Sequence, residues 1–132
     1  MRVPRHIWKQ LLPRNDDQIG SQEFLAVILG VYSFGLPSCM LWAFVDNQSV
    51  LGSIVKGSCC LAELNPAIGK LWLDCAALNF ALVVCRVESK ANVADGPTRD
   101  FFSLLEELDA VFVNPRLPDW AYNLWNWPVA FQ

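Results

Sequence analysis

Short continuous apolar runs alternate along this chain with stretches of helical spacing. Residues 21–34 are apolar at nearly every position from Phe24 on, which predicts a helix buried almost all round, although this pattern alone also fits a strand. Residues 41–45 and 80–87 are shorter apolar runs and predict two buried strands. Because helices separate these strands, we expect parallel pairing and an α/β fold, with helices flanking a short mixed or parallel sheet.

The connecting helices carry recognisable end signals. Residues 50–55 have helical spacing, and Gly57 is placed to end that helix. Asn65 and Pro66 are an expected N-cap and first helical residue of the next helix, and a last helix is expected over 100–108. The expected apolar stripes are Ile68, Leu71, Trp72, Cys75 and Leu78 in the former, and Phe101, Leu104, Leu105 and Leu108 in the latter.

The length of 132 residues corresponds to one domain or part of one. We divide it into a polar segment with a short helix (1–17), a folded domain (18–112) and a tail rich in proline and tryptophan (113–132). The tail tryptophans could stack on nucleic-acid bases, but packing on the core is the favoured interpretation.

Composition narrows the class of protein. A net charge of −3 gives no general sign of nucleic-acid binding, so only a local basic patch could provide it. The five cysteines are odd in number and lie in or beside apolar stretches, which favours reduced, buried thiols. No signal peptide is visible, so a cytoplasmic or nuclear location is the default.

One uncharged stretch raises the question of a membrane span. Residues 24–45 carry no charge and exceed the roughly 20 residues that cross a bilayer. Residues 33–38 contain serine, glycine and proline in the middle of that stretch, which is typical of a turn. We therefore expect two core elements joined by a tight connection, with a small single-span membrane protein as the alternative.

Three acids mark the ends of the expected elements. Glu23 opens the first long helix, Asp46 ends the first strand, and Asp95 precedes the last helix. In a sheet covered by helices these points can converge at one edge, and clustered carboxylates suit hard divalent cations. Each has a simpler interpretation: Asp46 and Asp95 as helix caps or solvated loop acids, and Glu23 as an acid that complements the helix dipole.

The order of these acids and their neighbours resembles the ribonuclease H domain of retroelement (retrotransposon) reverse transcriptases. The resemblance spans roughly residues 18 to 108. It is carried by QIGSQEFLA (18–26), DNQSVL (46–51) with VKGS (55–58), and RVESKANVADGPTR (86–99), of which the last is the most specific.

The resemblance implies a five-stranded sheet with helices on both faces and a nuclease that hydrolyses RNA in RNA–DNA hybrids. It implies that Glu23, Asp46 and Asp95 are catalytic ligands of two Mg²⁺ or Mn²⁺ ions. Lys90 stands where many relatives have a histidine. With Arg86 and Arg99 it forms a candidate patch for nucleic-acid contact, against the alternative of scattered solvated cations.

The chain departs from the family pattern upstream of Glu23. The family's first carboxylate lies on its first strand, but residues 1–20 show no alternating apolar pattern, and Asp16 and Asp17 match no family motif. We expect this fragment to lack the first strands and their aspartate, which upstream reverse-transcriptase sequence would supply. The strand at 41–45 would then have an open edge, and the chain alone could be a noncatalytic remnant that needs a partner to fold.

Overall fold

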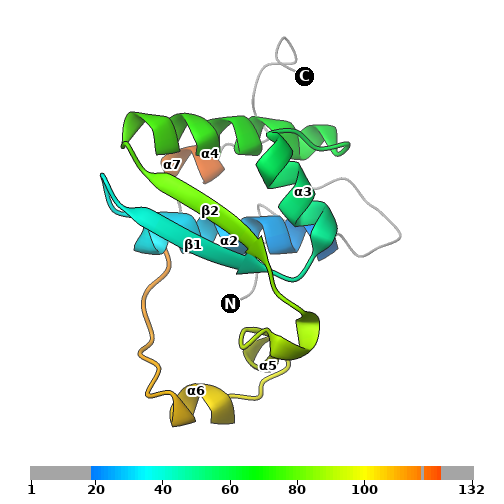
Figure 1. Ribbon diagram of the computed structural model, residues 1–132, viewed down its shortest axis with the longest axis vertical. Coiled ribbons are helices and arrows are strands. Elements are labelled where there is room, and N and C mark those ends of the chain that lie inside the picture. Colours follow the sequence, from blue (N-terminus) through cyan, green and yellow to red (C-terminus); the bar gives the residue numbers. More distant parts are fainter. Residues whose placement is uncertain (1–18, 117, 123–132) are drawn as a thin grey trace.

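The computed structural model describes residues 19–116 and 118–122 of the chain. The short helix expected within 1–17, and Trp125 and Trp127 of the tail, lie outside the described residues. The elements in chain order are α2 (Ile19–Phe34), β1 (Met40–Val45), α3 (Gln48–Lys56), the 3₁₀ turn η1 (Ala62–Leu64), α4 (Asn65–Ala77), β2 (Ala81–Arg86), the 3₁₀ turn η2 (Ser89–Ala91), α5 (Asp95–Thr98), α6 (Ser103–Glu107) and α7 (Asp119–Tyr122) (Figure 1).

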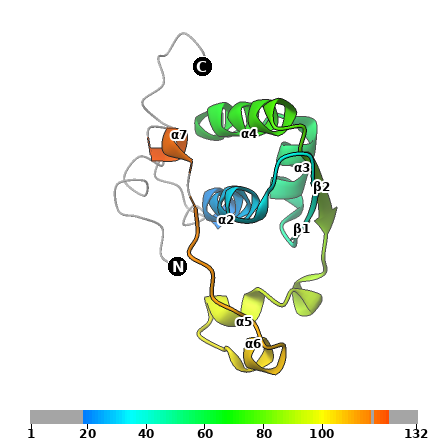
Figure 2. The same ribbon diagram turned by 90° about the vertical axis from the view of Figure 1, so that its left-hand side faces the viewer.

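The two strands form a parallel pair, as the sequence predicts. Met40 lies opposite Ala81 and Val45 opposite Arg86, and α3, η1 and α4 make the crossover between the strands. Helices α2, α3 and α4 all lie on one side of this sheet (Figure 2). The described residues therefore form an α/β unit with one covered and one bare sheet face, where the family resemblance implies five strands covered on both faces.

The hydrophobic core lies between the helices and the covered face of the sheet. Ile54 of α3 and Ile68 and Leu71 of α4 are completely buried, and Phe24 and Ile28 of α2 are 1% exposed. These residues recur at helical spacing, so the stripe expected in α4 is confirmed for Ile68, Leu71 and Cys75. Leu78 falls just past the end of α4 and is half exposed.

Side-chain and backbone caps fix the ends of α3. Asn47 precedes the helix, and its side-chain oxygen accepts hydrogen bonds from the backbone N–H groups of Ser49 (2.9 Å) and Val50 (3.2 Å). Gly57 ends the helix in the left-handed conformation, with φ of 77°, which a side chain would disfavour. The predicted role of Gly57 is confirmed.

Helix α4 begins one residue earlier than the sequence predicts. Asn65 is the first helical residue and not the N-cap, which is Leu64. The Asn65 side chain is instead bonded to the preceding loop, where its oxygen accepts from the Cys59 N–H (2.7 Å) and its nitrogen donates to the Cys59 carbonyl (3.1 Å). The 3₁₀ turn η1 runs directly into α4, which leaves no room for a separate cap.

The prediction of a continuous helix over residues 100–108 is wrong. Asp100 has φ of 61°, which interrupts the helical path, and only Ser103–Glu107 is helical in this region as α6. Phe101, Leu104 and Leu108 are 70%, 44% and 59% exposed, and only Leu105 is partly buried. Most of the expected stripe therefore meets no packing surface among the described residues. Short helices depend on such packing, and without it only one turn or so persists.

The uncharged stretch 24–45 is divided between α2 and β1. The turn expected within it is present, since the Cys39 N–H bonds to the Leu36 carbonyl (3.2 Å) and the chain reverses before Met40. Among the described residues, no helix is long and apolar enough to cross a membrane.

A candidate carboxylate site

Glu23, Asp46 and Asp95 come from three separate elements and line one cavity of about 750 Å³. The cavity lies between α2 and β1, and the loop before α5 forms part of its wall. Asp46 lies at the carboxyl end of β1, which is a common position for functional groups in α/β sheets. The three candidate residues thus lie around one space, although up to 72 positions separate them in the sequence (from 23 to 95).

Glu23 lies in α2, four residues beyond its first residue, Ile19. The first turn of that helix holds no acid, so the dipole interpretation of Glu23 does not apply. Its Oε2 atom is buried and has no hydrogen-bond partner. Burial raises the pKa of the Glu23 carboxyl, a hydrogen bond with Asn47 opposes this change, and the negative charge of Asp46 adds to it. Glu23 therefore has an unsatisfied oxygen next to a second acid, an arrangement that a cation would stabilise.

Asp46 is half buried and follows the buried Val45. The Val45 carbonyl accepts a hydrogen bond from the Val87 N–H (3.1 Å), which continues the ladder one residue past Arg86, the last residue of β2. The helix-cap interpretation of Asp46 is wrong, because Asn47 caps α3. The sequence interpretation overlooked Asn47, even though an Asp-Asn pair before a helix offers two potential caps.

Asp95 is the first residue of α5 and is held by the loop before it. Its backbone N–H donates to the Asn92 carbonyl (3.1 Å), and the Asn92 side-chain oxygen accepts from the Ala94 N–H (3.1 Å). The Asp95 carboxylate pairs with Arg99 at 3.4 Å, and the two side chains are 42% and 69% exposed. Such an exposed pair contributes little stability and is easily exchanged for another cation.

The three candidate basic residues flank the Asp95 loop in the sequence and differ in their contacts. Arg86 ends β2 and Lys90 lies in η2, and both are exposed, whereas Arg99 is bonded to Asp95. Arg86 and Lys90 therefore present charge to solvent, and Arg99 lies against one of the acids that line the cavity.

The donor set fits a hard divalent cation in its chemistry, because carboxylate oxygens are the ligands that Mg²⁺ and Mn²⁺ prefer. Among the residues that the structure describes, however, no group of three His, Cys, Asp or Glu side chains is placed to hold one ion together. The acids are arranged around the wall of the cavity and do not form a closed ligand set.

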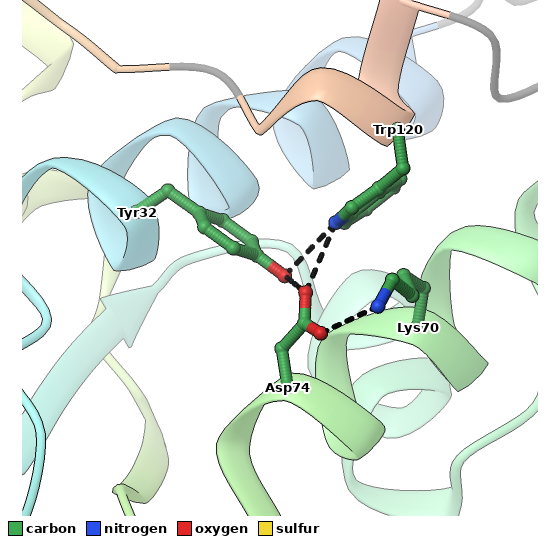
Figure 3. A network of polar contacts seen from close by, with 4 residues as sticks. All are labelled: Tyr32, Lys70, Asp74 and Trp120. Atoms are coloured by element: carbon green, nitrogen blue, oxygen red, sulfur yellow. Dashed lines mark hydrogen bonds and ion pairs between the residues drawn. The ribbon is translucent and has the colours of Figure 1, made fainter. Parts of the chain in front are cut away.

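A second polar cluster, which the sequence did not predict, joins α2, α4 and α7 (Figure 3). One oxygen of Asp74, Oδ2, accepts hydrogen bonds from the Tyr32 hydroxyl (2.5 Å) and the Trp120 indole (3.0 Å), and Lys70 Nζ lies 2.6 Å from the other oxygen, Oδ1. Trp120 also meets Tyr32 edge to face, with ring centroids 5.7 Å apart. The favoured packing role of the tail tryptophans is confirmed for Trp120.

The comparisons with known proteins give no independent identification. No family model, no curated protein and no solved structure matches the chain.

Proposed function

We propose that this chain is the C-terminal part of a ribonuclease H-like nuclease domain from a retroelement, which cleaves RNA in RNA–DNA hybrids. The observation that supports the proposal best is the meeting of Glu23, Asp46 and Asp95 at one cavity. The motifs that resemble the family place the same three residues in the same order. The parallel sheet, with an acid at the carboxyl end of its first strand, is compatible with that fold.

Each acid has a distinct part in the proposed site. Asp46 would be the central ligand, because β1 fixes its backbone and Asn47 serves as the adjacent cap. Glu23 would offer its buried, unpartnered Oε2, and a cation there would reverse the rise in its pKa. Asp95 would join as a ligand after exchanging its exposed pairing with Arg99.

The bound Mg²⁺ or Mn²⁺ pair would supply an activated water and stabilise the leaving oxygen of the phosphodiester. Exposed Lys90 and Arg86 would contact backbone phosphates of the hybrid, which positions the strand without reading its sequence. Arg99, once released from Asp95, would be available for the same contact.

The proposed site needs a fourth carboxylate, and the motif order places that residue upstream of Glu23. We propose that reverse-transcriptase sequence preceding the domain supplies it on a strand. The test is cleavage of a labelled RNA–DNA hybrid in Mg²⁺, comparing this chain with a version extended upstream by a strand that carries an aspartate. The extended version should cleave, and Asp46→Asn in it should abolish both cleavage and Mg²⁺ affinity.

Asp109→Asn is a matched control, because it makes the same chemical change at an exposed residue away from the cavity. The nuclease proposal fails if the extended version does not cleave and Asp46→Asn leaves Mg²⁺ affinity unchanged.

A second candidate is a noncatalytic remnant of the same element that needs a partner to fold. One observation favours it: Met40, Trp42 and Phe44 of β1 are 60%, 56% and 62% exposed, which is unusual for three large apolar side chains on one strand. This candidate predicts poor solubility and weak hydrogen-exchange protection of β1. A cooperative, monomeric unfolding transition of the isolated chain would contradict it.

A further inference from the structure

One edge of β1 has no hydrogen-bonding neighbour among the described residues. The sheet consists of β1 and β2 only, and the carbonyls of Cys39 and Val45 accept bonds from the β2 side. Successive residues of a strand direct these groups to opposite edges, so Met40, Trp42 and Phe44 direct their N–H and C=O groups to the open edge. An edge of this kind can pair with an added strand.

The open edge borders the same cavity that holds the acids. Ala26, Leu29 and Phe34 of α2 line it on one side and Trp42 and Phe44 of β1 on the other, so its walls are mostly apolar. Its volume is about 750 Å³. A strand of about five residues fills about 800 Å³, given a rise of about 3.3 Å, a strand spacing of about 4.8 Å and a thickness of about 10 Å. The cavity thus has the volume of one strand beside the six-residue β1.

Helix α2 already covers this vacant position, which argues against a second copy of the chain as its occupant. Figure 2 shows α2 on the same side of the sheet as the other large helices. If two copies paired through β1, their edge strands would lie about 4.8 Å apart, and both α2 helices would lie above the junction. Packed helices need about 8–10 Å between their axes. A single extended segment without its own covering helix avoids this conflict.

The charge of the cavity is confined to one end. Helix α2 and β1 are joined by a tight connection after Phe34, so they run in opposite directions, and Glu23 and Asp46 lie together at the other end. Asp95 lines the cavity as well. Without metal, these carboxylates complement a basic residue at the matching end of an added strand.

We propose that the cavity between α2 and β1 is a strand-accepting groove. Its occupant is an extended segment of a partner protein, about five residues long, that pairs with the open edge of β1. The segment is apolar where it faces α2 and carries a lysine or arginine at the end next to Glu23 and Asp46. This inference rests on the groove and not on the proposed nuclease, in which the domain's own upstream strand would take the same edge of β1. It states the chemistry of the partner that the second candidate requires.

The test uses acetylated and amidated peptides of alternating valine and threonine, with lysine at one end or the other. Binding to the full chain is followed by backbone amide shifts and hydrogen exchange. We expect new protection at Met40, Trp42 and Phe44. N-methylation of alternate peptide amides should abolish binding for one set of positions and not for the other, because only one edge of the peptide faces β1.

Replacing the lysine by norleucine should weaken binding about fivefold at low salt, which corresponds to about 1 kcal/mol. Equal binding of both N-methylated sets, or no binding by any peptide, would overturn the inference. Protection of the β1 edge through self-association of the chain would also overturn it, because the occupant would then be a second copy.

The same experiment separates this inference from the nuclease proposal. If Mg²⁺ binds the carboxylates, it should remove the preference for lysine and leave the peptide bound. A lysine preference that Mg²⁺ does not change would count against the metal site and support the groove. Insensitivity to the position of N-methylation would count against the groove, whatever Mg²⁺ does.

Discussion

Asp74→Asn is predicted to loosen the attachment of α7 and to destabilise the whole chain. Asp74 is half buried, and its carboxylate is the shared acceptor for Tyr32, Trp120 and Lys70, which come from three helices. Asparagine keeps the shape and one acceptor oxygen but loses the charge. The substitution therefore tests the charge of the cluster rather than its packing.

The expected cost is about 2 kcal/mol. Hydrogen bonds to a charged acceptor contribute about 1.5–3 kcal/mol, against about 0.5–1.5 kcal/mol for a neutral one, so the Tyr32 and Trp120 bonds each lose about 1 kcal/mol. The Lys70 pair is 32% and 23% exposed and therefore screened, which limits its contribution to a few tenths of a kcal/mol.

The pH dependence of this cost has a definite sign. Burial raises the pKa of Asp74, but the hydrogen bonds from Lys70, Tyr32 and Trp120 outweigh burial and hold the pKa below its ordinary value. A carboxyl whose pKa is lower in the folded than in the unfolded chain contributes stability above the unfolded value, about 3.9. That stability is lost as the pH falls through the folded pKa. The difference between wild type and Asp74→Asn should be full at pH 7 and shrink in acid.

Urea unfolding at pH 7 and at a series of acid pH values measures this difference, with Asp109→Asn as the control. Asp109 is exposed and adopts a left-handed conformation that asparagine tolerates, so the control should change stability by less than about 0.5 kcal/mol. Equal stabilities of the two variants at pH 7, or a cost that does not shrink in acid, would refute the reasoning.

Three further substitutions test other parts of the structure. Glu23→Gln should stabilise the metal-free chain at pH 7, because burial raises the pKa of Glu23 and disfavours its ionised form; in urea unfolding the gain should fade below the ordinary glutamate pKa of about 4.3. Asn47→Ala should cost about 1 kcal/mol through the lost cap of α3, read as a lower urea midpoint with an unchanged slope. Gly35→Ala should cost about 1–3 kcal/mol, because its Cβ would lie 2.5 Å from the Val31 carbonyl oxygen; Gly52→Ala, which meets no atom within 4 Å, should be neutral or stabilising in the same thermal melt.

The local parts of the fold could be predicted from sequence because they depend on neighbouring residues. The apolar runs placed β1 and β2 within one or two residues of their observed bounds, and the crossover between them required parallel pairing. Gly57 was predictable because its left-handed conformation favours glycine. Asp46 could be placed at a strand end because it directly follows the apolar run of residues 41–45.

The parts that failed depend on contacts distant in sequence. The stripe at 100–108 has helical spacing, but spacing cannot show whether a packing surface exists, and Phe101 and Leu104 remain exposed. Asp74 is separated by 42 residues from Tyr32 and by 46 from Trp120, so no local pattern signals their cluster. The pairing of Arg99 with Asp95 is local, at i and i+4, but the charge pattern alone did not separate it from phosphate contact.

The most direct test of the central claim is a Mg²⁺ titration of the isotope-labelled chain, followed by the backbone amide resonances of Glu23, Asp46 and Asp95. If these acids form one metal site, their amides should shift together with a single midpoint, and Asp46→Asn should remove the shifts at all three. Asp109→Asn should leave the titration unchanged. Independent midpoints at the three residues, or no shifts near the cavity, would contradict a shared site.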